Sequence, residues 1–366
     1  MTYKLNEKLE FSEPYIVNEN VCAIRLDANE SFIDPGEELR EKILTALRGV
    51  SFNRYPDNSY KELRQVAGNL FDTDPDLMVI GNGSDELLSL LIGSFLKSDD
   101  LLMLRRQDFS MYSIFASVYE RKTCFFEENG NGEPDIHDIL TKIQEQNVNA
   151  VLFSNPNSAN STVTAKERIL ELADNTDALV IIDEAYMDFS DQSVSRETAA
   201  RDNLIVLRTC SKALGCAGIR LGFALSSERI INVLNALRPP YNLNILTEAV
   251  ACAVLSETGY IKDAISHIVV NRAELYKELK ALEYSEYINK IYPTATNFIC
   301  IETDHADYIH ESLKARSIMV RNFKKRLRIT VGTKEENKAV AEGIKSVLKD
   351  IKNNDDNAGK GGKSND

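Results

Sequence analysis

Short apolar runs alternate with helical patterns through most of the chain. Four runs rich in Val, Ile and Leu occur at 149–153 (NAVLF), 178–182 (ALVII), 204–207 (LIVL) and 222–225 (GFAL). Continuous apolar runs of this length are typical of strands that are buried on both faces. Between the first two runs, residues 164–176 have helical periodicity. This alternation predicts an α/β fold, with a mostly parallel sheet that is covered by helices on both faces.

The C-terminal part has a different pattern. Short strands are predicted at 297–301 (NFICI), 318–321 (IMVR) and 327–331 (LRITV), with helices between and after them. The last of these helices has one apolar face, formed by Val340, Ile344, Val347, Leu348 and Ile351. This mixture predicts a smaller α+β domain, which begins near Pro239–Pro240 or after Glu257.

The end of the chain is polar. From Asn353 onward it is rich in glycine and has no apolar residue besides one alanine. Such a segment buries too little apolar surface to offset the entropy of ordering it, so we expect disorder. The predicted organisation is an N-terminal arm (1–35), a large domain (36–240), a small domain (241–352) and a disordered polar tail (353–366).

Composition and charge narrow the class of protein. A net charge of −13 argues against binding to nucleic acid or to an anionic membrane. No apolar run is long enough for a membrane span, and the N-terminus lacks the apolar core of a signal peptide. The six cysteines form no C-x-x-C pair, and there is no histidine cluster with zinc spacing. We therefore expect a cytoplasmic protein with reduced thiols and no metal site.

Ligands of a parallel sheet bind beyond the carboxyl ends of its strands. The residues that follow the predicted strands read SNPNSANS (154–161), DEAYMDF (183–189) and RTCSKALG (208–215). Asp183 directly follows a buried strand, where a carboxylate is costly unless a cation or several donors meet it. It is either a helix cap or buried ion pair, or the partner of a protonated ring nitrogen. Tyr186, three residues on, is placed to reach the same ligand.

A glycine-rich turn, GNGSDELL (81–88), leads into an apolar helix. Free N–H groups at such a helix start suit a phosphate, although Gly-Ser-Asp is also simply a good helix start. Ser211 and Arg220 offer a hydroxyl and a guanidinium for the same anion. The segment 207–225 contains Lys212 but no acidic residue. Lys212 is therefore not explained as half of a salt bridge along a helix. A phosphate cradle, an aspartate for a ring nitrogen and an isolated lysine that forms a Schiff base together describe a pyridoxal-phosphate site.

With these motifs in this order, the chain resembles the fold-type I pyridoxal-phosphate enzymes, and most closely the histidinol-phosphate aminotransferase family. The resemblance extends over roughly residues 14–348. It rests on the segments LDANES (26–31), RYPDNSYKELR (54–64), GNGSDELL (81–88), DFSMY (108–112), IIDEAYMDF (181–189), RTCSKALGCAGIRLGFA (208–224) and LRITVGT (327–333). It implies a mostly parallel seven-stranded sheet with helices on both faces, a smaller α+β C-terminal domain, and amino transfer between L-glutamate or 2-oxoglutarate and a phosphorylated small substrate.

The resemblance also implies roles around the cofactor, pyridoxal 5'-phosphate. Lys212 holds the cofactor and moves a proton, Asp183 pairs with the pyridine nitrogen, and Tyr186 hydrogen-bonds the ring hydroxyl. Phe109 has the position of the aromatic residue that stacks on the ring. The implied ligands of the cofactor phosphate are Gly83, the amides of Ser84 and Asp85, the Ser211 hydroxyl, Arg220, and Tyr55 from the other subunit of a homodimer.

Four residues are implied in binding the substrate. Asn29 has a position near the substrate. Arg321 and Arg328 match the residues that bind its anionic end, and Tyr15 reaches across from the partner chain. Taken alone, Arg321 is better explained as a surface arginine, but its seven-residue spacing from Arg328 across a strand turn supports the pairing.

One segment departs from the family pattern. Where the family usually has Asn-Pro-Thr-Gly, this chain has Ser158-Ala159-Asn160-Ser161. Ser158 thus has the position of the asparagine that contacts the ring hydroxyl, and Asn157 or Asn160 is a possible substitute. The departure leaves open a decarboxylase of a phosphorylated amino acid, like the related threonine-phosphate decarboxylases. A third alternative is a non-catalytic binding or regulatory protein, against which the intact cofactor motifs argue.

Overall fold

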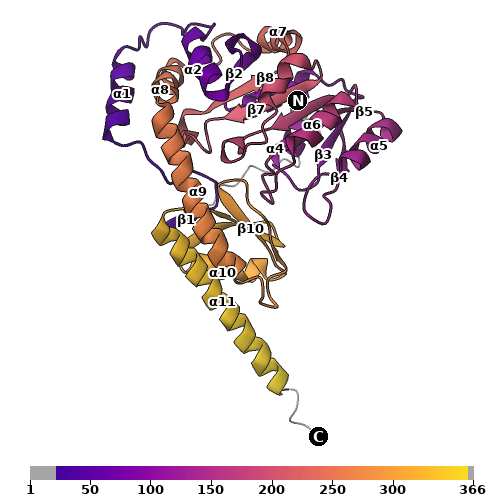
Figure 1. Cartoon of the computed structure of the whole chain (residues 1–366), viewed down its shortest axis with the longest axis vertical. Coiled ribbons are helices and arrows are strands. Elements are labelled where there is room, and N and C mark those ends of the chain that lie inside the picture. Colours follow the sequence, from indigo (N-terminus) through magenta and orange to yellow (C-terminus); the bar gives the residue numbers. More distant parts are fainter. Residues whose placement is uncertain (1–21, 362–366) are drawn as a thin grey trace, which may run out of the picture.

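A computed structural model describes residues 22–361 of the chain. The molecule has a large domain and a small domain, and the long helix α9 (Thr258–Lys280) runs from one into the other (Figure 1). The predicted division into a large α/β part and a smaller α+β part can be followed in the same view, with the sheet of the large domain above that of the small one.

The large domain is built on a seven-stranded sheet. Its strands lie in the order β2 (Met78–Asn82), β8 (Leu221–Leu225), β7 (Leu204–Thr209), β6 (Leu179–Asp183), β5 (Val148–Ser154), β3 (Leu101–Arg105) and β4 (Lys122–Phe126). Strand β8 is antiparallel to both of its neighbours, and all pairs from β7 to β4 are parallel. The four strands predicted from the apolar runs are β5 to β8, and the prediction of a mostly parallel sheet is confirmed.

Helices cover both faces of this sheet. Alternate residues of a strand point to opposite faces, so a strand that is apolar throughout needs a helix layer on each side. Val180 and Ile182 of β6 belong to one hydrophobic core and Ile181 to the other. The first core packs under α2 (Lys61–Phe71), α5 (Ile136–Gln146), α6 (Lys166–Asp174) and α8 (Ile245–Leu255), with α1 (Glu37–Arg48) lying against α8. The second packs under α3 (Ser84–Ser94), α4 (Met111–Val118) and α7 (Glu228–Leu237).

The small domain has a five-stranded sheet. Its strands lie in the order β1 (Ile24–Leu26), β11 (Ile318–Asn322), β12 (Arg326–Thr330), β10 (Phe298–Glu302) and β9 (Lys290–Ile291). The C-terminal half of α9 packs on this sheet together with α10 (Ala306–Ala315) and α11 (Lys334–Gly361). The predicted apolar face of the last helix is buried in this core, and the three predicted strands are β10, β11 and β12.

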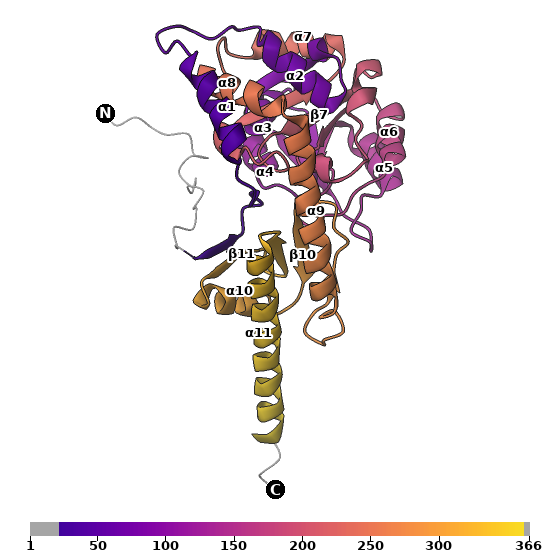
Figure 2. The ribbon, with the colours of Figure 1, turned by 60° about the vertical axis from the view of Figure 1, so that its left-hand side comes forward.

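The predicted borders at residues 35 and 240 differ from the packing of the two cores, which lies closer to the alternative start of the small domain after Glu257. Strand β1 lies in the predicted N-terminal arm, yet it pairs in parallel with β11 and completes the small sheet, as Figure 2 shows. Helix α8 lies beyond residue 241 but packs on α1 and α2 of the large domain. The change of domain therefore falls within α9. A change of domain inside a helix cannot be predicted from the sequence, because hydrophobic periodicity does not tell which core each half of the helix joins.

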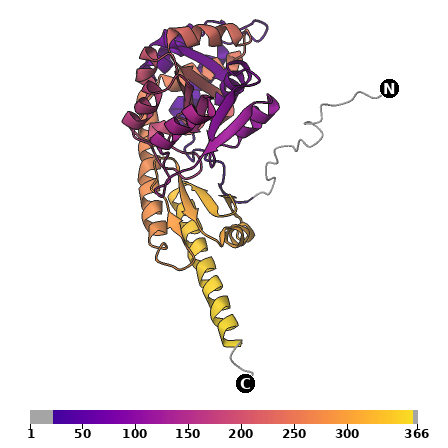
Figure 3. The same cartoon turned by 90° about the vertical axis from the view of Figure 1, so that its right-hand side faces the viewer.

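The polar tail also differs from its prediction. We expected disorder from Asn353, but α11 continues to Gly361 and extends away from the rest of the small domain (Figure 3). Its last buried apolar residue is Ile351. Once a helix is nucleated, each further residue adds a backbone hydrogen bond, so a packed helix can run on past its apolar face. Residues 362–366 lie outside the described part.

Two features are absent from residues 22–361. No helix in this part combines the length and the apolar composition of a membrane span. No three histidine, cysteine, aspartate or glutamate side chains in it gather where they could hold a metal ion.

Candidate active site

The candidate site forms where the carboxyl ends of β5, β6 and β7 meet. Strands β5 and β6 are in register from Ala150 and Leu179 to Ser154 and Asp183, so the last residues of both strands lie side by side. The loop that carries Lys212 follows β7, and β8 returns beside it. The common edge of parallel strands thus brings together segments that are far apart in the sequence.

Asp183 is a buried carboxylate, with 4% of the residue exposed. It accepts hydrogen bonds from the Tyr112 hydroxyl at 2.7 Å and from the Ala185 amide at 3.1 Å. Burial raises the pKa of Asp183 to about 7, although the hydrogen bond from Tyr112 acts in the opposite direction. Both of these donors are neutral. A cationic partner would stabilise this carboxylate, because burial penalises the charged form of an acid unless a cation compensates.

Lys212 lies in the loop between β7 and β8 and is partly buried. Its Nζ donates a hydrogen bond of 3.1 Å to the carbonyl of Ala28 and lies 6.0 Å from the centre of the Tyr186 ring. Within residues 22–361, no carboxylate makes an ion pair with this amine. The amine is therefore held by a neutral acceptor inside the site, in keeping with the expectation that it is not half of a salt bridge.

Asn29 orients the Tyr186 hydroxyl. Its fully buried side chain donates a hydrogen bond of 2.8 Å from Nδ2 to the Tyr186 oxygen. The Thr330 hydroxyl fixes Asn29 in turn. It accepts a hydrogen bond of 3.0 Å from the backbone amide of Asn29 and donates one of 3.1 Å to the side-chain Oδ1. Because the Tyr186 oxygen accepts from Asn29, its own proton is available to a further acceptor.

The first turn of α3 and the residue Arg220 lie side by side and form a corner of the site. Gly83, which precedes this helix, has a left-handed φ of +80°. A side chain at Gly222 would lie 2.3 Å from the amide of Ser84, so only glycine lets β8 approach the start of α3 so closely. Arg220 donates to the Asp85 carboxylate at 3.0 Å. Amides of a first helical turn have no acceptor within the helix, so this corner suits an anion.

Ser211 lies next to Lys212 on the same loop. Its hydroxyl accepts a hydrogen bond of 3.0 Å from the Thr209 hydroxyl, and its amide donates to the same Thr209 oxygen at 3.2 Å. These two bonds fix the direction of the Ser211 side chain at the end of β7. The hydroxyl proton of Ser211 is thereby left for an acceptor other than Thr209.

Ser158 is turned toward a carboxylate. Its hydroxyl donates to Asp108 at 2.9 Å, and Asp108 also accepts from the amide of Ser154 at 2.8 Å and from that of Phe109 at 2.8 Å. Asp108 thus ties the end of β5 to the loop that carries Phe109, whose ring meets that of Tyr112 edge-on at 5.6 Å. Burial raises the pKa of Asp108, although the charge of Arg105 and the hydrogen bonds from Ser154 and Ser158 act in the opposite direction.

The two asparagines considered as substitutes for the family residue have other partners. The side-chain oxygen of Asn157 accepts from the amides of Ala159 and Asn160, and its Nδ2 donates to the Gln107 carbonyl at 3.3 Å. Asn160 donates to Glu128 and to the carbonyl of Gly132, each at 2.9 Å. Both amide groups therefore hold the loop together.

Arg321 and Arg328 are directly opposite each other in the antiparallel pair of β11 and β12. Arg328 donates to the carbonyl of Ser158 at 2.9 Å and to that of Asp27 at 3.3 Å. Its guanidinium lies 5.3 Å from the ring centre of Phe323, and that of Arg321 lies 5.9 Å from the same ring. The predicted closeness of the two arginines across a strand turn is thus observed, and Arg328 connects them to the end of β5.

Of the two tyrosines expected to act across subunits, Tyr55 lies in the described part of the chain. Tyr55 is 79% exposed and stacks on Tyr241 with the ring centres 4.6 Å apart. Tyr15 lies outside the described residues. Among the described residues of one chain, no contact joins Tyr55 to Lys212.

A model of the family Aminotransferase class I and II matches residues 23–344. The chain belongs to this family. Its relatives include the histidinol-phosphate aminotransferase of Clostridium kluyveri, 34% identical over 348 residues, which cover 94% of this chain and 98% of the relative. That of Pyrococcus furiosus is 33% identical over 355 residues, covering 93% and 97%.

Solved structures share the fold of this aminotransferase. The histidinol-phosphate aminotransferase of Sinorhizobium meliloti, in complex with pyridoxal-5'-phosphate, matches with a TM-score of 0.85 and 21% identity, covering 96% of this chain and 99% of that one. The L-threonine-O-3-phosphate decarboxylase of Porphyromonas gingivalis matches with a TM-score of 0.76 and 19% identity, covering 89% and 99%. At these identities the two structures support the fold alone.

Family membership confirms the prediction of a transaminase that depends on pyridoxal phosphate. The described residues of this aminotransferase also fit that cofactor. Asp183 offers a buried carboxylate whose observed donors are neutral, Lys212 offers an amine held by a carbonyl, and the corner between Gly83 and Arg220 suits a phosphate group. These three features lie at one edge of one sheet.

Two residues of the site were not predicted. Tyr112 and Asp108 both lie in the DFSMY segment that carried the family resemblance, but only Phe109 was given a role. The sequence holds a weak signal for Tyr112, which lies three residues after Phe109 at the start of an apolar helix. Nothing in the sequence indicates that Asp108 meets Ser158, because 50 residues separate them.

Proposed function

We propose that this aminotransferase exchanges an amino group between L-glutamate or 2-oxoglutarate and the pair histidinol phosphate and imidazole acetol phosphate, as a step of histidine biosynthesis. The observation that carries the substrate class is the opposed pair Arg321 and Arg328, with Arg328 on the Ser158 carbonyl. Two guanidinium groups suit a dianionic phosphate, which offers several charged acceptors. The names of the near full-length relatives support the same substrate.

Pyridoxal phosphate, when bound, supplies an electron sink for the charge that develops at the substrate Cα. We assign Asp183 to its ring nitrogen, and Tyr186 and Ser158 to the neighbourhood of its ring hydroxyl. The exposed face of Phe109 is assigned to stacking on the ring. The proposed ligands of its phosphate group are Gly83, Ser84, Asp85, Ser211, Arg220 and, from the partner subunit, Tyr55.

Lys212 carries the covalent attachment and moves the proton at the substrate Cα in this proposal. The Ala28 carbonyl holds its Nζ on the side where Asn29 and Tyr186 lie. Because Asn29 donates to the Tyr186 oxygen, Tyr186 presents its proton rather than its lone pair to the ring hydroxyl. Asn29 and Arg328 are assigned to the substrate, and both are fixed by contacts to backbone or to Thr330.

We further propose a cytoplasmic homodimer in which Tyr55 and Tyr15 serve the active site of the partner. Phe52 and Tyr55 are each 79% exposed, and Tyr55 stacks on the partly exposed Tyr241. Clustered exposed aromatic residues are typical of protein–protein interfaces. All six cysteines are free thiols, as expected in a reducing compartment.

A decarboxylase of a phosphorylated amino acid is the second candidate. The observation that favours it is Ser158, which has the place of the family asparagine and donates to Asp108. The ring hydroxyl would then have fewer donors than in the usual aminotransferase site. Both reactions need Lys212, Asp183 and the two arginines, so the products must decide between them.

The test uses the holoenzyme and Lys212→Ala. Borohydride should fix the cofactor on the peptide that contains Lys212, and L-glutamate should change the visible absorption. Imidazole acetol phosphate should then restore the original spectrum, whereas the unphosphorylated ketone should not. Lys212→Ala should lose all three responses and stay folded, whereas Lys325→Ala, a change at an exposed lysine, should keep them. Full turnover by Lys212→Ala, or restoration by the unphosphorylated ketone alone, would reject the proposal.

A further inference from the structure

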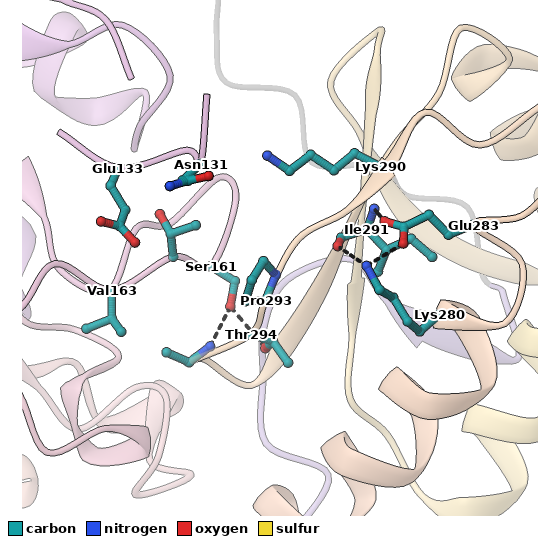
Figure 4. Close-up of a pocket in the computed structure, with 12 residues that line it drawn as sticks. Asn131, Glu133, Ser161, Val163, Lys280, Glu283, Lys290, Ile291, Pro293 and Thr294 are labelled. Atoms are coloured by element: carbon teal, nitrogen blue, oxygen red, sulfur yellow. Dashed lines mark hydrogen bonds and ion pairs between the residues drawn. The ribbon is translucent and has the colours of Figure 1, made fainter. Parts of the chain in front are cut away.

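The segment that departs from the family pattern is a contact between the two domains. Ser158 accepts from Arg328 of β12 through its carbonyl at 2.9 Å. Ser161 has a left-handed φ of +69°, a conformation that favours glycine, and its hydroxyl meets those of Thr296 at 2.6 Å and Thr294 at 3.0 Å. Figure 4 shows Ser161 and Thr294 facing each other beside a cavity between the two domains. The volume of this cavity is about 450 Å³.

Asn160 connects the same segment to a buried ionic bridge. Its Nδ2 donates to Glu128 at 2.9 Å. Glu128 belongs to the large domain, where it also accepts from Arg105 at 3.1 Å, and it accepts from Arg326 of the small domain at 2.6 Å. Arg326 makes two more contacts, to Glu302 at 3.0 Å and to the Tyr292 hydroxyl at 2.5 Å.

This bridge is shielded from water. The side chains of Arg105, Glu128 and Arg326 are 1%, 17% and 11% exposed. Burial alone would raise the pKa of Glu128, but the hydrogen bonds and charges of Arg326 and Arg105 outweigh it and hold that pKa below its ordinary value. Ion pairs at a surface contribute little, whereas removing one partner of a buried pair leaves an uncompensated charge. Glu128 therefore acts on the position of Arg326 far more strongly than a surface carboxylate would.

Arg326 and Arg328 are two residues apart on β12, so their side chains lie on the same face of the strand. Arg326 reaches Glu128 and Arg328 reaches Ser158, and both partners belong to the large domain. Two positions on one face of this strand are thereby held against the large domain. Fixing the first position restricts the strand that carries the second.

We propose that Glu128 and Arg326 are positioning residues that hold Arg328 and the segment 158–161 in the geometry that receives the anionic end of the substrate. The inference rests on the proposed function for the identity of that substrate. Removing the bridge should weaken the binding of both amino donors, since Arg328 serves both, while the attachment of the cofactor to Lys212 is unchanged.

The experiment compares Glu128→Gln, Arg326→Gln and the double variant in the holoenzyme. Glu127→Gln is the matched control, because this neighbouring glutamate is 61% exposed and pairs with the exposed Arg106 at the surface. We expect KM for L-glutamate and for histidinol phosphate to rise roughly tenfold to a hundredfold in each single variant, with a smaller change in kcat. The rise in KM of the double variant should be smaller than the product of the two rises in the single variants, because both changes break the same bridge.

A second readout does not depend on the substrate. Hydrogen exchange of the peptides that cover 156–162 and 326–330 should speed up together in Glu128→Gln by about tenfold, and stay within about twofold of the wild type in Glu127→Gln. If Glu128→Gln does not fold, Asn160→Ala tests the same link from the other side. This change removes the hydrogen bond to Glu128 together with those to Gly132 and Thr162 of its own loop, so faster exchange of the peptide that covers 326–330 is the decisive result.

These readouts separate the two proposals. A wild type that does not turn over histidinol phosphate rejects the proposed function, and joint exchange of both segments then still supports the bridge. Unchanged KM values in a folded Glu128→Gln, or faster exchange in only one of the two segments, overturn the bridge while the proposed function stands.

Discussion

The Tyr112 hydroxyl donates a hydrogen bond of 2.7 Å to the buried carboxylate of Asp183. Tyr112 belongs to α4, which covers one face of the sheet, and Asp183 is the last residue of β6. A residue of the helix layer thus affects the charge of a residue at the end of a strand. Asp183 is useful to a protonated ring nitrogen only when it is ionised. The bond favours that form, and it therefore affects how strongly the cofactor is held.

Tyr112→Phe should weaken cofactor binding in a pH-dependent way. The hydrogen bond lowers the pKa of Asp183, which burial has raised to about 7, so its removal should raise that pKa further. Less of the carboxylate is then ionised at pH 7, and we expect the dissociation constant of pyridoxal phosphate to rise roughly threefold to tenfold there and to approach the wild-type value near pH 9. Tyr119→Phe is the control, because Tyr119 bonds to Ser89 instead. An equal weakening at all pH values would contradict this role.

The raised pKa of Asp183 also predicts a stability effect in the cofactor-free protein. A buried acid whose pKa in the folded state is above its usual value of 3.8 adds stability at low pH, and this contribution is lost as pH rises through about 7. The unfolding free energy of the wild type minus that of Asp183→Asn should fall by about 2 kcal/mol between pH 5 and pH 7. Denaturant titrations at several pH values measure this difference, and a flat difference would refute the raised pKa.

Sharing of residues between subunits is tested by mixing inactive variants. If Tyr55 serves the neighbouring site, a heterodimer of Lys212→Ala and Tyr55→Ala has one site with an intact lysine and an intact tyrosine from across. Co-refolding the two variants should recover up to half of the activity per heterodimer. Lys212→Ala with Asp183→Ala should recover none, because both changes lie in the site of their own chain. Recovery in neither mixture, with heterodimers detected, would count against sharing.

Arg321 and Arg328 should differ in their effects on the two half-reactions. Arg328 contacts the active-site segment directly, so Arg328→Gln should slow both half-reactions about a hundredfold. Arg321 lies opposite it on the next strand, so Arg321→Gln should slow the half-reaction of histidinol phosphate about tenfold and that of L-glutamate far less, since a carboxylate has fewer charged acceptors than a phosphate. Single-turnover rates with each amino donor measure this. Equal effects of Arg321→Gln on both donors would refute the assignment.

The local elements of this fold were predictable from the sequence because their signals are local. The apolar runs that became β5 to β8 are each continuous, and the last helix has its apolar residues on one face. The parallel order of the large sheet then followed from the alternation of strands and helices. The pairing of β1 with β11 was not predictable. A strand of three residues close to the N-terminus has too short a pattern to indicate which strand it pairs with.

The candidate site was predictable where family motifs and strand ends coincide, as at Asp183 and Lys212. The contacts between these residues were not, because they join positions that are far apart in the chain. Asp108 and Ser158 meet across 50 residues, and Glu128 and Arg326 meet across 198. The sequence showed that residues 158–161 differ from the usual family pattern. Their partners became known only from the packing of the two domains.

The products formed from two candidate substrates decide between amino transfer and decarboxylation. The purified holoenzyme is mixed with histidinol phosphate and 2-oxoglutarate, and separately with O-phospho-L-threonine, and both glutamate and carbon dioxide are measured. We predict one glutamate formed per histidinol phosphate consumed, no such reaction with unphosphorylated histidinol at the same concentration, and no carbon dioxide from O-phospho-L-threonine. Release of carbon dioxide from O-phospho-L-threonine without formation of glutamate from histidinol phosphate would contradict it.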